Sequence, residues 1–377
     1  MAAILRPEEA RVDLGRLAAN FQATQSFAGR PLLPVVKADA YGHGAARVAR
    51  LLESLGAPAL AVAFVEEAVP LRAAGVRVPI VLMAGASVEE APLVAQHGLT
   101  PVVGSRRCLE GALAAARLAG KPLQAHLKVD TGLTRLGFAP GELVEAAGLL
   151  GSGNVTIDGL MTHLARADED AAASEAQLDR FDAALRELEA HGIRPRWVHG
   201  VNSAGLLHLR PSHTLVRPGL LLYGLRPRPR SPEVAVRPAM SLAGRVDLIR
   251  AVAAGTPVSY GGRWVASRPS RIATVSVGYA DGVPRTAAMQ ARGALSLRGR
   301  RARVAGTVCM DFTMLDVTDR PDVQEGDEAV VFGDDPTAWD VADWAGTNAW
   351  EVLTSVGLRV PRVYVEDGRT ADVLSRY

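Results

Sequence analysis

Short runs of apolar, often β-branched residues recur through the first 225 residues, at intervals of about twenty to forty positions. In the segments between them apolar residues return every three or four positions, as at Leu14, Leu17 and Phe21, which is typical of amphipathic helices. Alternating strands and helices predict β-α units around a parallel sheet. The runs that we interpret as strands span residues 33–37, 60–63, 80–83, 101–103, 125–129, 157–163, 197–202 and 215–223.

Eight strands in this order favour a (β/α)8 barrel of the TIM type. A doubly wound sheet is the alternative, and it usually carries a glycine-rich phosphate-binding turn directly after its first strand. Here the sequence Gly42-His43-Gly44 follows the first strand by four residues and lacks the third glycine. We therefore predict an α/β protein that begins with a barrel.

The pattern changes after residue 225. A Pro- and Arg-rich segment at 226–232 precedes stretches in which apolar and polar residues alternate, a pattern that predicts strands. These stretches are 242–249, 271–277, 303–308 and 328–332, and they are followed by a helical segment at 338–356 and a last strand at 361–365. We predict two domains, a barrel at 1–233 and a mainly β domain at 234–377.

Composition limits the kind of partner. The 377 residues include 42 Lys and Arg and 40 Asp and Glu, and their signs are interspersed, so we expect neither nucleic acid nor a membrane as partner, but a small molecule. Two cysteines, Cys108 and Cys309, are too few for a disulfide framework or a Cys-based zinc site, so no metal is expected. The first residues lack the apolar region of a signal peptide, which predicts a soluble cytoplasmic protein.

Polar residues gather at the ends of the predicted strands, where barrel enzymes carry their chemistry. Each has an ordinary structural explanation: Asn202 and Ser203 suit a helix cap, His163 a core histidine, and Arg217 a turn. Their coincidence on one rim of one barrel predicts a site instead. The residues in question are Lys37, Lys128, Asp130, Arg135, His163, His199, Asn202, Ser203, Arg217, Gly219 and Tyr223.

This rim suggests a specific ligand. A helix that begins at Ser203, next to the glycine-containing segment Gly219-Leu220, offers N–H groups and a hydroxyl to a phosphate after strands seven and eight. Pyridoxal phosphate needs such an anchor and also an amine that reacts with its aldehyde. We therefore expect Lys37 to bind this cofactor covalently.

The order of the motifs identifies the chain as similar to the bacterial alanine racemases along essentially its whole length. The motifs are PVVKADAYGHG, LKVDTGLTRLG, HGVNSA, VRPGLLLYGL, VSYGG, VGYADGVPR and VCMDFTM. This resemblance implies an isomerase that interconverts L- and D-alanine with pyridoxal phosphate and supplies D-alanine for peptidoglycan.

The resemblance also implies residue roles. Lys37 and Tyr260 would act as the two catalytic groups on opposite faces of the substrate, as racemisation requires. Arg217 would face the pyridine nitrogen and leave it largely unprotonated, because a guanidinium cannot accept a proton. The other implied cofactor-binding residues are Tyr41, His163, Asn202, Ser203, Gly219, Leu220 and Trp350.

Further implied roles concern the substrate and the assembly. The implied substrate-binding residues are Arg135, Met310, Asp311 and Tyr279. Lys128 corresponds to a lysine that is often carbamylated, which would give Arg135 an anionic neighbour. Tyr260 would serve the cofactor of a second subunit, so a homodimer is implied.

The chain departs from the family pattern in the substrate corridor. Trp350 stands where a tyrosine is usual, Thr307 replaces a usual arginine, and Arg166 replaces a small residue, whereas Asp168 and Arg285 match. These departures leave open a racemase of serine or of a broader range of amino acids. A non-catalytic pyridoxal-phosphate carrier is a further alternative, but such carriers lack the β domain and its tyrosine. A decarboxylase would need a glycine-rich phosphate loop and a C-terminal cysteine motif, which we do not find.

Overall fold

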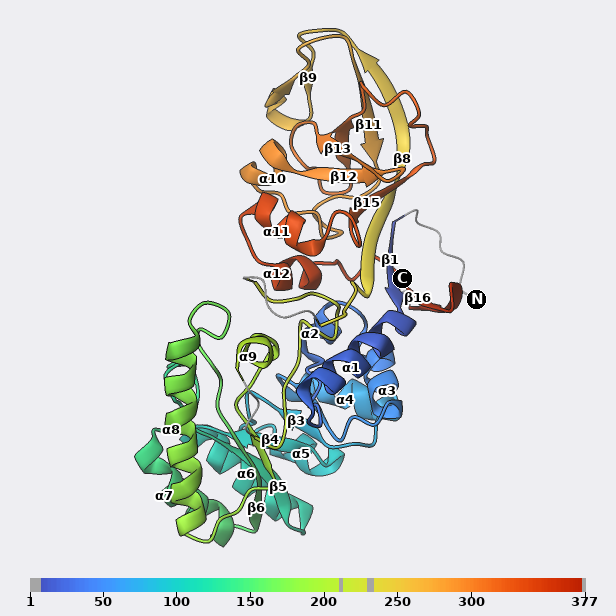
Figure 1. Ribbon diagram of the computed structural model, residues 1–377. Helices are drawn as coiled ribbons and strands as arrows, with labels where there is room; N and C mark the ends of the chain where they lie inside the picture. Colours follow the sequence, from blue (N-terminus) through green and yellow to red (C-terminus); the bar gives the residue numbers. More distant parts are fainter. Residues whose placement is uncertain (1–7, 210–212, 229–233, 375–377) are drawn as a thin grey trace. The chain divides into compact units, whose positions relative to one another are not determined.

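A computed structural model describes residues 8–209, 213–228 and 234–374 (Figure 1). Its contacts divide the chain into two compact units. The barrel unit comprises Leu17–Ala40 and Ala45–Val236, and the β unit comprises Met1–Arg16, Tyr41–Gly44 and Arg237–Tyr377. Within the described ranges no helix is both long and apolar enough to cross a membrane. Residues 1–7, on which the absence of a signal peptide was judged, and most of the 226–232 linker lie outside the described residues.

The barrel unit contains a parallel sheet in the order β2-β3-β4-β5-β6-β7. Its strands are β2 (Leu60–Val62), β3 (Ile80–Leu82), β4 (Thr100–Val103), β5 (Leu123–Lys128), β6 (Val155–Met161) and β7 (Trp197–His199). Its helical elements are α1 (Leu14–Ala28), α2 (Lys37–Tyr41), α3 (Ala45–Ser54), α4 (Val65–Ala73), α5 (Ala91–His97), α6 (Arg106–Ala119), η1 (Pro140–Glu142), α7 (Leu143–Ser152), α8 (Ala171–Ala190) and α9 (Ser203–His208).

Isolated bridges close this sheet into a barrel with eight strand positions. Val35 pairs with Ala61 of β2, Leu32 pairs with Val216, and Arg217 pairs with Asn202 after β7. Backbone hydrogen bonds accompany the bridges, among them Leu33 N–H to the carbonyl of Val216 at 2.7 Å. The predicted first and eighth strands therefore occupy their barrel positions as short extended segments.

Several predicted strands end earlier than expected. The sixth ends at Met161 and the seventh at His199, so His163, Asn202 and Ser203 follow their strands. The first and the eighth differ most. Lys37 does not end a strand but begins α2, because the chain turns there into a left-handed conformation. The eighth strand ends at Arg217, and Gly219–Gly224 form consecutive turns, with hydrogen bonds such as Leu222 N–H to the carbonyl of Gly219. Gly219 and Tyr223 therefore lie beyond the strand rather than along it.

A second closed ring of strands forms the β unit. The long strand β8 pairs antiparallel with both β15 and β11, which closes β8-β11-β14-β13-β12-β15 into a six-stranded barrel. β1, β16 and β17 extend the sheet beyond β8. The strands are β1 (Glu9–Asp13), β8 (Met240–Val252), β9 (Pro257–Val258), β10 (Trp264–Val265), β11 (Ser270–Val275), β12 (Ala294–Leu297), β13 (Arg300–Val304), β14 (Thr313–Asp316), β15 (Glu328–Phe332), β16 (Arg362–Glu366) and β17 (Arg369–Leu374).

The domain boundary predicted at residue 233 therefore differs from the observed units at the N-terminus. β1 lies between β8 and β16 and has parallel pairs such as Val12 with Tyr364. A pairing between the two ends of the chain leaves no local signal, because the partner strands lie hundreds of residues away in sequence. We expected all of residues 1–233 to belong to the barrel, whereas β1 belongs to the β unit.

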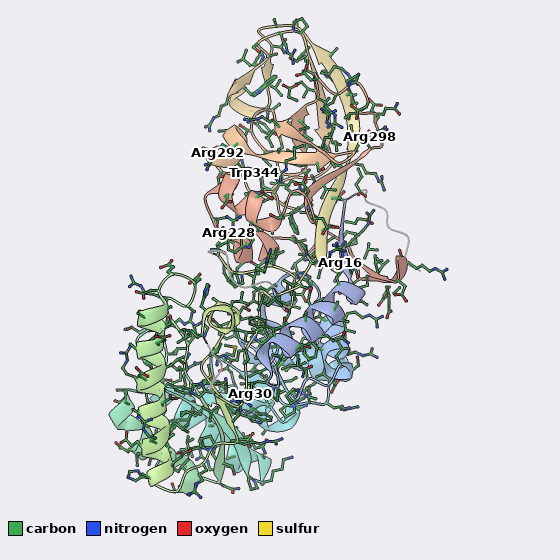
Figure 2. The ribbon with its side chains drawn as sticks, in the orientation of Figure 1. Arg16, Arg30, Arg228, Arg292, Arg298 and Trp344 are labelled. Carbon is green, nitrogen blue, oxygen red and sulfur yellow. The ribbon has the colours of Figure 1, made fainter. Side chains whose placement is uncertain are left out.

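Helical segments of the β unit are short: η2 (Tyr260–Gly262), α10 (Ala287–Arg292), α11 (Ala338–Ala345) and α12 (Ala349–Thr354). The single helix predicted over 338–356 is two helices, because Gly346 adopts a left-handed conformation after α11 and Asn348 caps α12. Arg292 links α10 to α11 by donating to the carbonyls of Asp343 and Trp344 (Figure 2).

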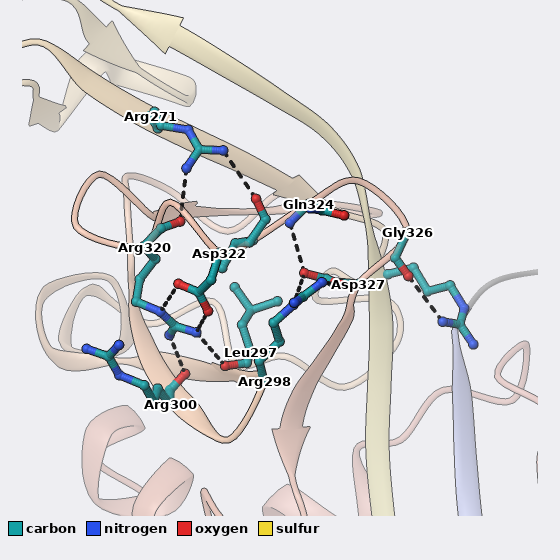
Figure 3. A network of polar contacts seen from close by, with 11 residues as sticks. Arg271, Leu297, Arg298, Arg300, Arg320, Asp322, Gln324, Gly326 and Asp327 are labelled. Carbon is teal, nitrogen blue, oxygen red and sulfur yellow. Dashed lines mark hydrogen bonds and ion pairs between the residues drawn. The ribbon is translucent and has the colours of Figure 1, made fainter.

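An arginine network holds the loop between β14 and β15 (Figure 3). Arg320 is 5% exposed, donates to the carbonyls of Leu297 and Arg300, and pairs with Asp322 at 2.8 Å. Arg298 pairs with Asp327 at 2.7 Å. Every contact of these guanidinium groups is internal to the β unit, so the network stabilises its fold.

Candidate active site

Lys37 opens an unusual turn. Ala38, Asp39, Ala40 and Tyr41 have φ values of 52°, 54°, 55° and 53°, so four consecutive residues with side chains adopt the left-handed conformation. Each such residue costs roughly 1–2 kcal/mol relative to the right-handed form. Persistent strain of this kind is typical of functional sites.

Carboxylates hold this turn in place. Glu67 accepts the N–H of Ala38 at 2.6 Å with one oxygen, and those of Ala63 and Phe64 at 2.6 and 3.2 Å with the other. Asp39 accepts the N–H of Ala45 at 2.7 Å. Glu67 thereby joins the turn after Lys37 to the loop between β2 and α4.

Arg217 is the most buried cation of the barrel unit, with 2% of its surface exposed. Its Nη2 donates to the carbonyl of Thr162 at 2.7 Å and approaches Nδ1 of His163 at 3.4 Å. Its Nη1 contacts the carbonyl and Nδ1 of His199. Its Nε is buried without a hydrogen-bond partner in the described structure.

The contact with His199 extends into the core of the barrel. Nε2 of His199 lies 2.9 Å from Nδ1 of His126, and the two rings meet edge to face. Burial and the charge of Arg217 lower the pKa of His126 to about 4 and hold the pKa of His199 well below its ordinary value. Both rings are therefore neutral at neutral pH and accept or relay hydrogen bonds without adding charge beside Arg217.

A cluster of cations faces this rim. Burial, followed by the charges of Arg217 and Arg135, lowers the pKa of Lys128 to about 8. Burial, followed by the charge of Arg135, lowers the pKa of Lys37, although the charge of Glu67 raises it in part. Burial and all four neighbouring cations hold the pKa of His163 well below its ordinary value. Such a surplus of positive charge favours an anionic ligand.

At the predicted phosphate anchor, backbone amides after the eighth strand meet the hydroxyl of Ser203. The hydroxyl oxygen of Ser203 accepts the N–H of Gly219 at 2.9 Å and approaches that of Leu221 at 3.5 Å. Leu220, which lies between them, is buried. Asn202 caps α9 by accepting the N–H of Gly205 at 2.9 Å, so its side chain has the capping role considered above.

These residues fit a pyridoxal phosphate. The unpartnered N–H of Arg217 is a buried donor suited to a pyridine nitrogen, which accepts but does not require a proton. Lys37 provides an amine whose pKa is already lowered, and the hydroxyl of Ser203, whose oxygen accepts the N–H of Gly219, keeps its own hydrogen to donate to an anion.

In the β unit, the segment after β13 brings the remaining predicted residues together. The carbonyls of Cys309 and Met310 accept the N–H groups of Tyr279 and Ala280. The Tyr260 side chain is 70% exposed and that of Met310 51%. The carboxylate of Asp311 pairs with Arg359 at 2.7 Å, so it helps to fix the conformation of this segment.

Comparison with known proteins shows the family of the chain. The family model for the alanine racemase N-terminal domain matches residues 12–227, and that for the C-terminal domain matches residues 239–364. The chain belongs to the alanine racemase family. A relative named alanine racemase, from Carboxydothermus hydrogenoformans, is 39% identical over 370 residues, which cover 96% of this chain and 100% of the relative.

Solved alanine racemase structures have the same fold. The enzyme from the D-cycloserine producer Streptomyces lavendulae is 37% identical and covers 96% of this chain and 98% of its own, with a TM-score of 0.90. The alanine racemase from Bacillus anthracis with bound L-Ala-P is 30% identical, with a TM-score of 0.90 and 99% of each chain covered. The predicted fold class, a barrel followed by a mainly β domain, is confirmed.

Residues at which this alanine racemase family member departs from the usual pattern have local partners. Trp350 meets Trp339 edge to face, with ring centroids 5.6 Å apart. Arg166 is exposed and lies 3.6 Å from Asp170, the cap of α8. Arg285, which matches the family pattern, lies over the ring of Tyr279, with its guanidinium carbon 5.8 Å from the ring centroid.

Tyr41 and Asp168 also have defined surroundings. Tyr41 is buried and belongs by its contacts to the β unit, and burial raises its pKa to about 12, so it is a neutral donor. Asp168, by contrast, is half-buried on the segment between β6 and α8.

Sequence reasoning missed Glu67 and His126. Glu67 lies three residues after Phe64, which has no side-chain oxygen to complete a capping box, so the sequence carried no signal for its contact with Ala38. His126 precedes Lys128 by two residues and so shares its face of β5, a signal that was available in the sequence.

Proposed function

We propose that this protein interconverts L- and D-alanine with pyridoxal phosphate by a two-base mechanism. The observations that carry the proposal are Arg217, a fully enclosed guanidinium with one unpartnered N–H, and Lys37, held at the start of a strained turn; the charges of both act on His163. An aspartate at this place would favour a protonated ring nitrogen, whereas Arg217 would leave that nitrogen unprotonated. The cofactor would then be a weaker electron sink, so a carbanion at the α-carbon would not accumulate, which suppresses side reactions.

The cofactor would be held by residues with separate tasks. Lys37 binds it covalently, Arg217 donates to its ring nitrogen, and His163 lies beside Arg217. Ser203 and the amides of Gly219 and Leu220 anchor its phosphate, with Asn202 shaping that turn and Tyr41 and Trp350 adding donors. When bound, the cofactor withdraws electrons from the substrate α-carbon and so acidifies its proton.

Lys37 and Tyr260 would move the proton. Burial and Arg135 lower the pKa of Lys37, which increases the neutral fraction that can accept a proton. Tyr260 takes or returns the proton on the other face. Arg135, Met310, Asp311 and Tyr279 would bind the substrate, with the cation attracting the carboxylate.

Lys128 would carry a carbamate. Its pKa of about 8 leaves part of the amine neutral at neutral pH, which is the form that reacts with CO2. The product replaces a cation among cations by an anion, which relieves repulsion with Arg135 and Arg217.

A homodimer would complete the site. A catalytic tyrosine needs a site that excludes water, but Tyr260 is 70% exposed, and Met310, Phe312 and Tyr279 are also exposed in the β unit. A second subunit that covers these side chains would bury them against its own cofactor. We further infer a cytoplasmic enzyme that supplies D-alanine for peptidoglycan.

The test begins with purified protein. We expect visible absorbance that borohydride abolishes while fixing the cofactor to the peptide that contains Lys37, and α-deuteration of both alanine enantiomers in heavy water. Parallel assays with serine, lysine and arginine test whether the enzyme racemises other amino acids. The departures from the family pattern at Trp350, Thr307 and Arg166 are the reason for testing this alternative. Cofactor binding without exchange of any of these amino acids would instead favour the carrier.

A further inference from the structure

We propose that Thr307 and Ser259 are positioning residues, which together fix the backbone of Tyr260 through a reciprocal pair of hydrogen bonds. The inference rests on the proposed function of Tyr260, since it concerns how that side chain is aimed. It gives a role to the threonine that stands where the family pattern has an arginine.

The backbone around Tyr260 is strained. Ser259 has φ 66° and ψ −176°, a region that is populated almost only by glycine, and Gly261 and Gly262 follow with φ 73° and 53°. A residue with a side chain stays in this region only where its surroundings hold it there. Because the Tyr260 ring is 70% exposed, packing does not set its direction, and the backbone must do so.

Two hydroxyl groups provide that hold. Ser259 Oγ donates to the carbonyl of Thr307 at 2.6 Å, and Thr307 Oγ1 donates to the carbonyl of Tyr260 at 2.9 Å. Gln290 Oε1 lies 3.5 Å from the same threonine oxygen, and Cys309 Sγ lies 3.7 Å from Ser259 Oγ. Each hydroxyl therefore hydrogen-bonds the backbone of the other segment, and the two bonds fix Ser259 and Tyr260 relative to Thr307.

The two segments approach closely because Gly306 has no side chain. A Cβ there would lie 2.6 Å from the carbonyl oxygen of Val258 and 2.9 Å from Cβ of Ser259. Thr307 itself is 4% exposed, so its hydroxyl points inward and not toward solvent or substrate. An arginine at this position would carry its donors at the end of a long side chain, whereas the threonine hydroxyl lies next to the backbone and reaches the carbonyl of Tyr260.

The consequence is specific to one catalytic group. A displaced Tyr260 impairs proton transfer on its own face of the substrate and leaves the Lys37 face unaffected. Loss of the Thr307 hydroxyl should therefore slow α-proton exchange unequally for the two enantiomers of alanine, whereas a general loss of folded protein would slow both alike.

The experiment compares Thr307→Val, Thr307→Ser and the control Thr313→Val. Thr313 is a buried threonine of β14 whose hydroxyl donates to the carbonyl of Val277 at 2.7 Å, so its replacement removes a comparable bond away from the Tyr260 turn. Amide hydrogen exchange of holoenzyme without substrate is followed in peptides covering 259–264. α-Deuteration of L- and D-alanine is measured separately in heavy water.

We expect exchange of these amides to rise roughly 2- to 12-fold in Thr307→Val, the factor that corresponds to one neutral hydrogen bond. Thr313→Val should leave them unchanged, and Thr307→Ser should restore both the amides and the balance between enantiomers. Equal amide exchange in Thr307→Val and wild type, or an equal loss for both enantiomers, would overturn the proposal. If wild-type protein exchanges neither enantiomer, the proposed function fails, and the amide comparison alone then decides whether Thr307 holds the turn.

Discussion

Replacing Glu67 by Gln tests whether this carboxylate holds Lys37 in place. In the wild-type protein the N–H groups of Ala38, Ala63 and Phe64 all donate to the carboxylate. The amide of the variant keeps one acceptor oxygen but places an NH₂ donor against one of these sets of N–H groups. A hydrogen bond to a charged group is worth about 1.5–3 kcal/mol and a neutral one about 0.5–1.5 kcal/mol. We therefore expect a loss of about 1–3 kcal/mol, which is roughly a 5- to 150-fold shift away from the ordered turn.

The left-handed turn explains why this loss should affect the cofactor. Its four residues with positive φ together cost roughly 4–8 kcal/mol, so the turn persists only while contacts such as that of Glu67 oppose the strain. Once the turn relaxes, Lys37 no longer points at a fixed place. Cofactor affinity, measured by absorbance titration of cofactor-free protein, should fall within the same range.

A second readout concerns the charge of Glu67. This carboxylate is the group that raises the pKa of Lys37, against burial and Arg135, so its removal should lower that pKa further. The pH at which the Lys37 amine becomes reactive toward an acylating reagent in cofactor-free protein should shift downward. Glu66→Gln is the matched control, since Glu66 is exposed on the same helix. Equal cofactor affinity and equal reactivity midpoints in both variants would refute the reasoning.

Three further outcomes are expected. With ¹³C-bicarbonate, NMR should detect a carbamate on the wild-type protein that is absent from Lys128→Met. In CO2-free buffer, the stability of the cofactor-free protein should rise from pH about 8 towards 10.5, because Lys128 loses its proton at lower pH in the folded state than in the unfolded state. Lys128→Met should lack this rise. Trp350→Tyr should raise kcat/KM for serine relative to alanine by up to about tenfold, since indole is the larger ring, and an unchanged ratio would contradict that role. Arg320→Met should lower the melting temperature by a few degrees, roughly 2–4 °C per kcal/mol, because two carbonyls lose their donor, whereas Asp322→Asn should change it less, since that carboxylate is half-exposed.

Much of the architecture was readable from local patterns. Apolar runs with helical spacing between them predicted the barrel strands because a strand or helix must repeat its own period wherever one face is buried. The motif around Lys37 and the position of Tyr260 pointed to the chemistry for the same reason, since each motif is continuous in the chain. The breaks at Gly346 and Arg217 were missed, because single capping or turn residues do not interrupt an apolar pattern.

Other features depend on partners that are distant in sequence. β1 joins the sheet of the β unit beside β16, Glu67 meets Ala38 across a loop, and Thr307 binds the backbone of Tyr260. The burial that gives Arg217 its unpartnered N–H and lowers the pKa of His126 likewise comes from several strands at once. The sequence by itself determined which residues carry reactive groups and near which strands of the barrel they lie. Only the tertiary structure decided how those groups are held and charged, because hydrogen bonding and burial depend on neighbours that chain order does not specify.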